Sequence, residues 1–294
     1  MTTETNVATV LITGTSTGIG LATSVAFGRA GHTVAATMRN PQRAPELAAI
    51  AAREKLPIHV STMDVDADAS VSDAIGRIVS EMGPIDVLVN NAGIERTGSV
   101  EELPLSEFRA VMETNYFGVL RCIKAVVPSM RQRRRGCIIN ISSVAGRIAT
   151  SPMAPYTASK FALEALSESL AQELQSFGVR VAIVQPGIID TQMARQIAVA
   201  GAASSYPHQH RFAGLFTAAL KNPVPASVVA DKVLEVAATG TGQLRHPVGP
   251  DALPFLGWRQ SMTDEEWVAW GALTDDAWYE RVQADFGLDA RPKG

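Results

Sequence analysis

Short apolar runs alternate with longer amphipathic stretches along most of this chain. The apolar runs are rich in β-branched residues and lie at residues 7–13, 32–38, 58–63, 85–89, 137–141, 179–184 and 244–248. Runs of this length and composition indicate strands that are buried on both faces. Strands that alternate with helices form a parallel sheet with right-handed crossovers. The pattern therefore predicts an α/β fold, with the last strand at an edge of the sheet.

The stretches between the strands have the apolar spacing of helices. The longest covers residues 105–134, and Pro128 is expected to bend it. Asn115 lies near its middle, where asparagine is a mediocre helix former. A special role for Asn115 and an ordinary satisfied polar residue both stay open.

The last part of the chain, residues 251–294, has a different character. It holds the four tryptophans, and residues 263–266 read Thr-Asp-Glu-Glu, which is typical of a capping box at the start of a helix. Thr274 and the two aspartates after it indicate a second helix start. We predict a main domain over residues 1–250 and a helical extension over 251–294 that packs on this domain or on a partner subunit.

A glycine-rich turn joins the first predicted strand to the first predicted helix. Gly14 can take the tight turn, Gly18 lets the backbone approach a pyrophosphate, and Gly20 permits close helix packing. The helix start adds free N–H groups and partial positive charge. The spacing is G-xxx-G-x-G and not the commoner G-x-G-xx-G, so a plain turn is the alternative. The context of strand, turn and helix predicts a dinucleotide phosphate site.

The second strand ends with Thr37, Met38 and Arg39. In a nucleotide-binding βαβ unit the adenosine ribose lies here, and an acidic residue selects NAD. This strand end has no carboxylate, and Arg39 can pair with a 2′-phosphate. The strand end therefore favours NADP, with a solvent-facing arginine as the alternative.

Other polar residues follow later strands. Asp64 ends the third, and Asn90 and Gly93 follow the fourth. Ligands of open parallel sheets bind at the carboxyl ends of the strands. We expect these residues near the same ligand.

Tyr156 and Lys160 lie four residues apart in a predicted helix. They share one helix face, a single turn apart. A nearby ammonium favours the phenolate and lowers the pKa of a phenol from its usual ~10, which suits a proton donor and acceptor near neutral pH. The pair alone is weak, because an exposed helix face gives the same spacing. Ser142 and Ser143 lie at the end of the strand predicted before this helix, and they strengthen the interpretation of Tyr156 and Lys160 as a reactive pair.

Composition excludes several classes of protein. The chain has 294 residues, of which 46% are apolar and 19% charged, with a net charge of −3. Nothing overall attracts it to nucleic acid or to an anionic membrane. The basic segment 131–135 is interpreted as a solvated loop. No run of eighteen apolar residues occurs and residues 1–6 are polar, so we expect a cytoplasmic protein.

Neither the cysteines nor the histidines form a recognisable metal or disulfide pattern. Cys122 and Cys137 lie in apolar surroundings and are expected to be buried thiols in a reducing compartment. His208 and His210 have no Cys, Asp or Glu at ligand spacing, so no metal is expected.

Taken together, the motifs resemble the short-chain dehydrogenase/reductase family over about residues 7–250. The matching residues are Thr13, Gly14, Gly18, Ile19, Gly20, Asn90, Asn91, Ala92, Gly93, Asn115, Ser143, Tyr156, Lys160, Pro186 and Gly187, in the family's order and spacing. The end of the second strand and residues 246–251 are most similar to NADP-linked members like the 17β-hydroxysteroid dehydrogenases. The resemblance implies a Rossmann-type, doubly wound, seven-stranded parallel sheet.

The resemblance also implies a catalytic tetrad. Tyr156 matches the proton donor for carbonyl reduction, and Lys160 matches the residue that lowers its pKa and binds the nicotinamide ribose. Ser143 matches the holder of the substrate oxygen, with Ser142 a weaker candidate. Asn115 matches the anchor of a water in the proton relay. The implied cofactor contacts are Gly14, Thr17, Gly18, Ile19, Gly20, Arg39, Asp64, Val65, Asn90, Ala92, Gly93, Tyr156, Lys160, Pro186, Gly187, Ile189 and Thr191, with Asp64 on the adenine and Thr191 on the nicotinamide amide.

These features predict an NADP-dependent ketone reductase or secondary-alcohol dehydrogenase with a fairly apolar substrate. An NAD-linked enzyme and a non-catalytic dinucleotide sensor are the alternatives, and the intact tetrad argues against the sensor. We expect a homo-oligomer, a dimer or a tetramer, although the long extension puts the family's usual tetramer in doubt. Residues 191–225 correspond to the family's substrate lid. Its apolar residues form either a pocket wall or helix packing: Met193, Phe212, Leu215 and Phe216.

Overall fold

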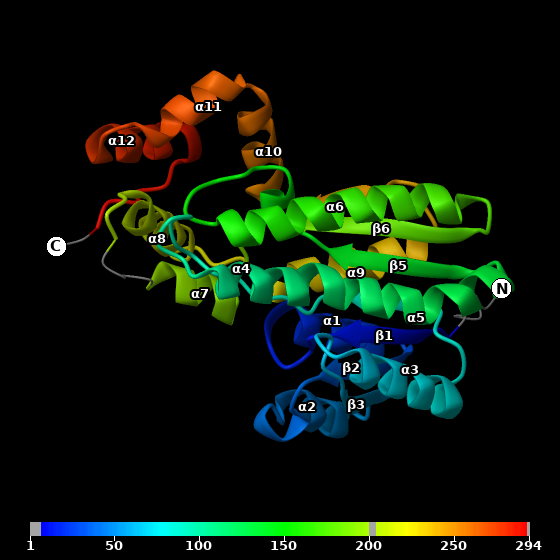
Figure 1. The fold of residues 1–294 in the computed structure, drawn as a ribbon. Helices are drawn as coiled ribbons and strands as arrows, with labels where there is room; N and C mark the ends of the chain where they lie inside the picture. The colour runs from blue at the N-terminus through cyan, green and yellow to red at the C-terminus, as the bar shows by residue number, and fades with distance from the viewer. Residues whose placement is uncertain (1–6, 200–203, 293–294) are drawn as a thin grey trace.

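The computed structural model describes residues 7–199 and 204–292. Seven parallel strands form one sheet in the order β3-β2-β1-β4-β5-β6-β7 (Figure 1). The strands are β1 (Thr9–Thr13), β2 (Thr33–Met38), β3 (Ile58–Thr62), β4 (Val87–Asn90), β5 (Gly136–Ile141), β6 (Val179–Pro186) and β7 (Arg245–Val248). The predicted parallel sheet and its edge strand are confirmed. Residues 1–6, whose polar character contributed to the expectation of a cytoplasmic protein, lie outside the described residues.

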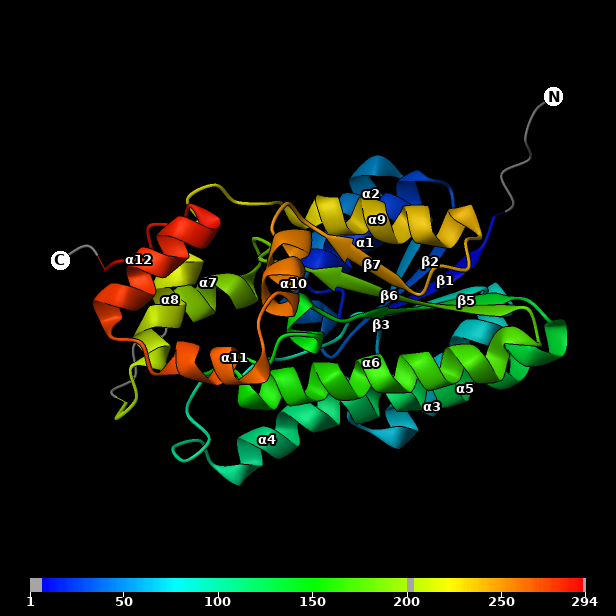
Figure 2. The same ribbon diagram turned by 90° about the horizontal axis from the view of Figure 1, so that it is seen from above.

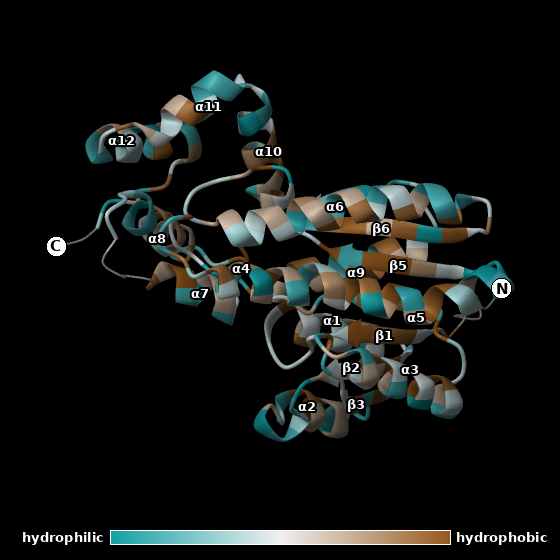
Figure 3. Cartoon of the chain, in the orientation of Figure 1, coloured by the Kyte–Doolittle hydropathy of each residue, from teal (hydrophilic) through white to brown (hydrophobic). Residues whose placement is uncertain are grey.

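Helices cover both faces of the sheet (Figure 2). On one face lie α1 (Gly18–Arg29), α2 (Glu46–Glu54) and α9 (Ala226–Thr239), and on the other α3 (Asp68–Met82), α5 (Gly118–Arg133) and α6 (Ala154–Gln175). Successive side chains of a strand enter opposite layers: Leu11 packs in one apolar cluster, and Val10 and Ile12 pack in the other. Each face removes apolar surface from water, which is the main source of stability. The hydropathy colouring shows the strands as the brown centre (Figure 3).

The predicted helix 105–134 is broken, and the break is not at Pro128. It consists of α4 (Leu105–Met112), a π-helical turn η2 (Glu113–Phe117) and α5, and Pro128 lies within α5. Asn115 is buried in the π-turn, and its side-chain amide forms hydrogen bonds with the backbone of Ile94, which follows β4. Single π-turns inside helices are frequent at functional sites.

The basic segment 131–135 also differs from the expected solvated loop. It ends α5, and Arg133 and Arg135 each pair with Asp86, at 2.8 and 2.9 Å. Cys122 and Cys137 are buried thiols, as expected, and burial raises their pKa to about 12 and about 11.

The segment between β6 and α9 contains two helices that the loose sequence pattern did not predict. These are α7 (Gln192–Ala198) and α8 (His208–Ala219). They lie at the carboxyl end of the sheet, beside the extension (Figure 1).

Three helices form the extension: α10 (Ala252–Gln260), α11 (Asp264–Gly271) and α12 (Asp275–Phe286). The predicted capping box is present, because Thr263 and Glu266 bond each other's backbone, and Thr274 caps α12. Helix α12 packs on α8 of the same chain, with Trp278 and Val282 near Ala218. Arg211 of α8 is buried and pairs with Asp275. The extension therefore arches away from β7 and returns to α8.

Candidate active site

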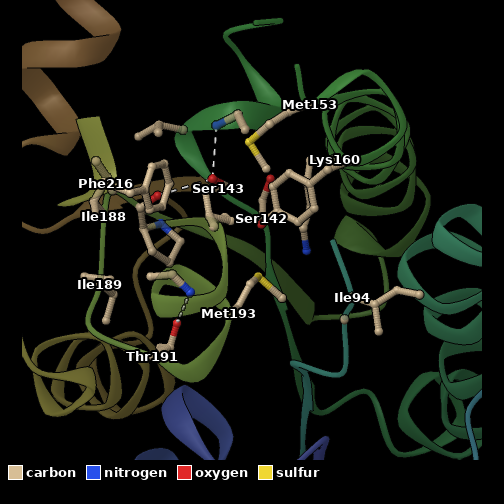
Figure 4. Close-up of a pocket in the computed structure, with 18 of the residues that line it drawn as sticks. Ile94, Ser142, Ser143, Met153, Lys160, Ile188, Ile189, Thr191, Met193 and Phe216 are labelled. Atoms are coloured by element: carbon tan, nitrogen blue, oxygen red, sulfur yellow. Dashed lines mark hydrogen bonds between the residues drawn. The ribbon is translucent and has the colours of Figure 1, made fainter. Parts of the chain in front are cut away.

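A cavity of about 570 Å³ opens at the carboxyl ends of the strands. Its wall comes from the segments that follow β1 to β6 and from α7, α8 and the extension. Figure 4 shows Ser143, Lys160, Thr191 and Phe216 around it. The cavity lies at the strand ends, where the sequence predicts the ligand site.

The glycine turn is locked to the end of β4 by close packing and hydrogen bonds. Gly14 has a φ of +70°, and a Cβ there would lie 2.6 Å from the Cα of Ala92. The Asn91 side-chain amide donates to the carbonyls of Thr13 and Gly14 at 2.9 and 3.0 Å. The Thr13 hydroxyl accepts from the N–H groups of Asn91 and Ala92, both at 3.0 Å. Thr13 and Asn91 were quoted in the family motif, but their role in holding the turn was not foreseen.

The rest of the turn leads into α1. Thr17, Gly18 and Ile19 lie on the cavity wall. Gly20 lies behind it, where a Cβ would come within 2.3 Å of the Gly14 carbonyl oxygen. This close packing is the role predicted for Gly20.

Arg39, Asp64 and Val65 line the cavity where β2 and β3 end. Arg39 is exposed, and in the described part of the chain no hydrogen bond or ion pair occupies its guanidinium. It also borders a smaller cavity of about 400 Å³, which is lined by β3 and by the residues that directly follow β2. This cavity and the free guanidinium leave room for an anion beside the strand end.

Asp66 is a carboxylate in this region that the sequence did not single out. The Thr114 hydroxyl donates to its Oδ2 at 2.9 Å, while its Oδ1 is buried without a partner in the described structure. Burial raises the pKa of Asp66, and the hydrogen bond from Thr114 opposes this.

Tyr156, Lys160 and Ser143 meet on the opposite wall. The Lys160 ammonium lies 5.5 Å from the centre of the Tyr156 ring and donates to the Ile141 carbonyl at 2.8 Å. The Ser143 hydroxyl accepts from the N–H of Ala145 at 3.1 Å. Ser142 is buried, and its hydroxyl has no partner among the described residues. The helix and the serine strand end are thus brought together as predicted.

The electrostatics of this pair differ from the expectation that Lys160 lowers the pKa of Tyr156. Burial raises the pKa of Tyr156 to about 12, and a hydrogen bond from Ser143 opposes this only in part. Burial also lowers the pKa of Lys160 to about 8, against the attraction of Glu164. Burial therefore shifts both groups toward their neutral forms.

Asn115 and Asn90 lie behind the wall and not on it. Asn115 bonds the N–H and the carbonyl of Ile94, both at 2.8 Å, and donates to the Ser159 hydroxyl at 3.0 Å. It therefore ties the strand end after β4 to the helix that carries Lys160. Asn90 donates to Asn140 at 2.8 Å within the sheet. Gly93, by contrast, lies on the wall.

The segment after β6 forms another part of the wall, with Pro186, Gly187, Ile189 and Thr191. The Thr191 hydroxyl accepts from the N–H of Ala194 at 3.2 Å and so caps α7. The N–H of Ile188 donates to Asp251 at 2.7 Å. The start of the extension therefore holds this segment, which the sequence did not reveal.

Four apolar residues of the segment 191–225, in which the resemblance places a substrate lid, all line the cavity: Met193, Phe212, Leu215 and Phe216. Aromatic residues of α10 to α12 line the same cavity beyond them. Sequence reasoning placed these aromatics in a packing extension and missed their contribution to the wall.

Neither histidine of the 208–210 segment belongs to a metal cluster. His208 lies on the wall, and His210 contacts Asp275 at 3.1 Å. Over residues 7–199 and 204–292, no three His, Cys, Asp or Glu side chains gather as a metal site would require. Within these residues no helix has the length and apolar character needed to span a membrane.

A model of the short chain dehydrogenase family matches residues 8–200, which include the glycine turn and Tyr156. The chain belongs to the short-chain dehydrogenase/reductase family. Its members are oxidoreductases that use a nicotinamide dinucleotide.

Relatives in this family match nearly the whole chain. The uncharacterized oxidoreductase YusZ of Bacillus subtilis is 35% identical over 274 residues, covering 90% of this chain and 95% of its own length. A short-chain dehydrogenase of Streptomyces avermitilis superposes with a TM-score of 0.77 at 30% identity, over 91% of this chain and 97% of that one. A gluconate 5-dehydrogenase of Burkholderia cenocepacia, in complex with NADP and tartrate, gives a TM-score of 0.71 at 27% identity, over 84% and 95% of the two chains. These matches support the Rossmann-type fold of the short-chain dehydrogenases for this chain.

Proposed function

We propose that this protein is an NADP-dependent reductase of ketones, or dehydrogenase of secondary alcohols, with an apolar substrate. The observation that carries the proposal is one continuous cavity. Its wall includes the glycine turn at one end, and Tyr156, Lys160 and Ser143 in the middle.

The residues present fit a nicotinamide dinucleotide. Gly14 has no side chain and lies against Ala92, so the backbone of the turn stays close to the end of β4, and the N–H groups at the start of α1 would face a pyrophosphate. Thr17, Gly18 and Ile19 would hold the phosphates, Asp64 and Val65 the adenosine, and Pro186, Gly187, Ile189 and Thr191 the nicotinamide. When bound, the cofactor supplies or accepts the hydride.

The residues of the chain supply the proton and stabilise charge. As a carbonyl is reduced, negative charge develops on its oxygen, and the hydroxyls of Ser143 and Tyr156 are donors for that charge. Tyr156 then gives up its proton, as a general acid. The Lys160 ammonium, fixed on the Ile141 carbonyl, stabilises the phenolate that remains. Asn115 keeps this arrangement in place through Ile94 and Ser159.

The choice of NADP follows from the end of β2. Arg39 is exposed there and has no carboxylate as a partner in the described structure. A guanidinium suits a phosphate, since it donates two parallel hydrogen bonds. The Burkholderia neighbour, which contains NADP, is consistent with this choice.

An apolar substrate follows from the wall beyond Tyr156. Phe212, Leu215, Phe216 and Met193 lie there. We further expect a cytoplasmic homo-oligomer, since both thiols are buried and reduced and the family commonly assembles into dimers and tetramers.

Turnover of a panel of ketones and secondary alcohols, steroids included, tests the proposal through the absorbance of NADPH. We expect reduction of apolar ketones by the wild type and a loss of 100-fold or more in kcat for Tyr156→Phe, which removes the proton donor. Tyr206→Phe is the matched control, because Tyr206 is exposed and bonds Glu101 away from the cavity. Equal activity of Tyr156→Phe and the wild type would refute the proposed role of Tyr156.

A further inference from the structure

The extension carries a cluster of aromatic rings at the far end of the cavity, which we call the aromatic chamber: Phe255, Trp258, Trp267, Trp270 and Phe286. Trp258 is its centre. Its ring lies 5.4 Å from Trp267, 4.9 Å from Trp270 and 5.0 Å from Phe286, and all three pairs pack edge to face. This is a favourable geometry for aromatic pairs.

The chamber is not an ordinary core. Helix α11 has no buried residue, and α10 buries only Ala252. All five rings are only partly buried, although all five line the cavity. Trp270 and Phe286 also pack against the buried cluster around Trp278, and the part of each ring that lines the cavity stays open to it. An apolar ligand placed there would remove this ring surface from water, which is favourable in proportion to the area covered.

Hydrogen bonds hold the polar edges of two rings. The Trp258 indole N–H donates to Asp285 at 2.9 Å, within the extension. The Trp267 indole N–H donates to the Ala149 carbonyl at 2.9 Å. Ala149 lies on the segment between Ser143 and Tyr156. This hydrogen bond therefore joins the chamber to the segment that carries the two reacting hydroxyls. Both donors are satisfied, and the rings offer the cavity apolar surface.

The charges near the chamber are already balanced. Arg211 of α8 reaches this part of the wall, where its charge is paired with Asp275 and its guanidinium donates to the Leu273 carbonyl, while its Nη1 is buried without a partner in the described structure. Burial lowers the pKa of His208, which favours the neutral imidazole. The chamber is therefore suited to an uncharged ligand.

We infer that the aromatic chamber binds the uncharged arm of the carbonyl substrate and prefers an arm that ends in a flat, unsaturated ring. The carbonyl lies at Ser143 and Tyr156, and the arm extends beneath α10 and α11. This inference rests on the proposed function. It names the substrate class: a long apolar ketone or secondary alcohol with a ring far from the reacting carbon.

The test compares ketones of increasing reach: 2-butanone, 4-phenyl-2-butanone, 6-phenyl-2-hexanone and 8-phenyl-2-octanone. The readout is kcat/KM for each phenyl ketone divided by that for 2-butanone. In the wild type we expect this ratio to rise at least 100-fold along the series. For the phenyl ketone that gives the highest ratio with the wild type, Trp258→Leu should lower this ratio by 10-fold or more. Leu253→Ala is the matched control, since Leu253 is on α10, 67% exposed and away from the cavity, and should leave the ratio unchanged.

If Trp258→Leu lowers kcat/KM equally for short and long ketones, or does not lower it at all, the ratio stays unchanged. Either result would overturn the inference. Thermal unfolding checks that each variant folds. If Trp258→Leu does not fold, Trp258→Phe replaces it, with a reduction of the ratio of about threefold because one smaller ring remains. An unchanged ratio in that variant also counts against the chamber.

Binding measured without turnover separates this inference from the proposed function. Tryptophan fluorescence is titrated with 8-phenyl-2-octanone in the wild type, Tyr156→Phe and Trp258→Leu. We expect saturable quenching in the first two and a Kd at least 10-fold higher in the third. If the wild type reduces no ketone but this difference holds, the proposed function fails and the chamber stands. If ketones are reduced but the Kd values agree, the chamber fails alone.

Discussion

The two ends of the cavity are built in different ways. At the glycine turn, backbone meets backbone: Gly14 lies against Ala92, and Thr13 and Asn91 fasten the two strand ends. At the other end, large side chains from separate helices surround the space, with Trp258 at their centre. The first end has no room for a side chain at Gly14 or Gly20, whereas the second is built mainly from large side chains.

This difference matches what each end has to bind. A cofactor of fixed shape can be held by rigid backbone and a few charges, and that end lies within residues 8–200, where the family model matches. The substrate end depends on α8 and the extension, beyond the limit of that match. We infer that the proposed cofactor end uses the part of the chain that the family model matches, and that the proposed substrate end also uses residues beyond it.

We expect the largest effect from a substitution in the glycine turn. Gly14→Val adds a branched side chain at a φ of +70°, where even a Cβ lies 2.6 Å from Ala92. We expect cofactor affinity to fall by more than 100-fold, measured by calorimetric titration with NADPH. Gly76→Ala is the control, because no atom lies within 4 Å of its Cβ, and it should bind NADPH normally. Normal NADPH binding by Gly14→Val would contradict the rigid turn.

Arg39→Ala tests charge in place of shape at the same end of the cavity. A hydrogen bond to a charged group contributes about 1.5–3 kcal/mol. We therefore expect kcat/KM with NADPH to fall roughly 10- to 100-fold, while kcat/KM with NADH changes little. Arg43→Ala serves as control, since Arg43 does not line the cavity. An equal loss with both cofactors would exclude Arg39 from cofactor selection and favour the NAD-linked alternative.

Trp267→Phe probes the link between the two ends. It keeps an aromatic ring but removes the hydrogen bond to the Ala149 carbonyl. A net hydrogen bond is worth about 1 kcal/mol, so we expect kcat to fall about fivefold, with short ketones as well as long ones. Leu253→Ala is again the comparison. Unaltered kcat would show that the extension does not position the Ser143 segment.

The smallest effect is a shift of a pH profile. Lys160 has a pKa of about 8, so it loses its charge above that pH, and the rate of ketone reduction should fall as pH rises through 8. The Glu164 carboxylate raises the pKa of Lys160. Glu164→Gln removes this attraction and should move the fall in rate to lower pH. A midpoint that stays in place or moves to higher pH in Glu164→Gln would show that Lys160 does not control the profile.

Much of the cofactor end could be predicted from the sequence because it depends on local chain order. Each strand run ends at the same edge of a parallel sheet, so Gly14, Asp64 and Pro186 converge without knowledge of packing. Tyr156 and Lys160 share a helix face for the same local reason. The roles of these residues remain predictions until the variants are measured.

The rest depends on tertiary contacts that spacing does not encode. Asn115 interrupts its helix because its amide is used by Ile94 and Ser159, which are distant in sequence. The net pKa of Tyr156 depends on how deeply it is buried, and no motif gives that. The tryptophans of the extension follow no single period, so the sequence could not show that they face the cavity.

The most direct test of the central claim follows the hydride itself. Wild-type protein is incubated with 8-phenyl-2-octanone and NADPH that carries deuterium at the transferable position of C4, and the product alcohol is analysed by mass spectrometry and NMR. We predict one deuterium on the carbinol carbon with the wild type, and with Tyr156→Phe at most about 1% as much labelled product over the same time. Reduction of the ketone without deuterium at that carbon, or deuterium transfer at the wild-type rate by Tyr156→Phe, would contradict the account.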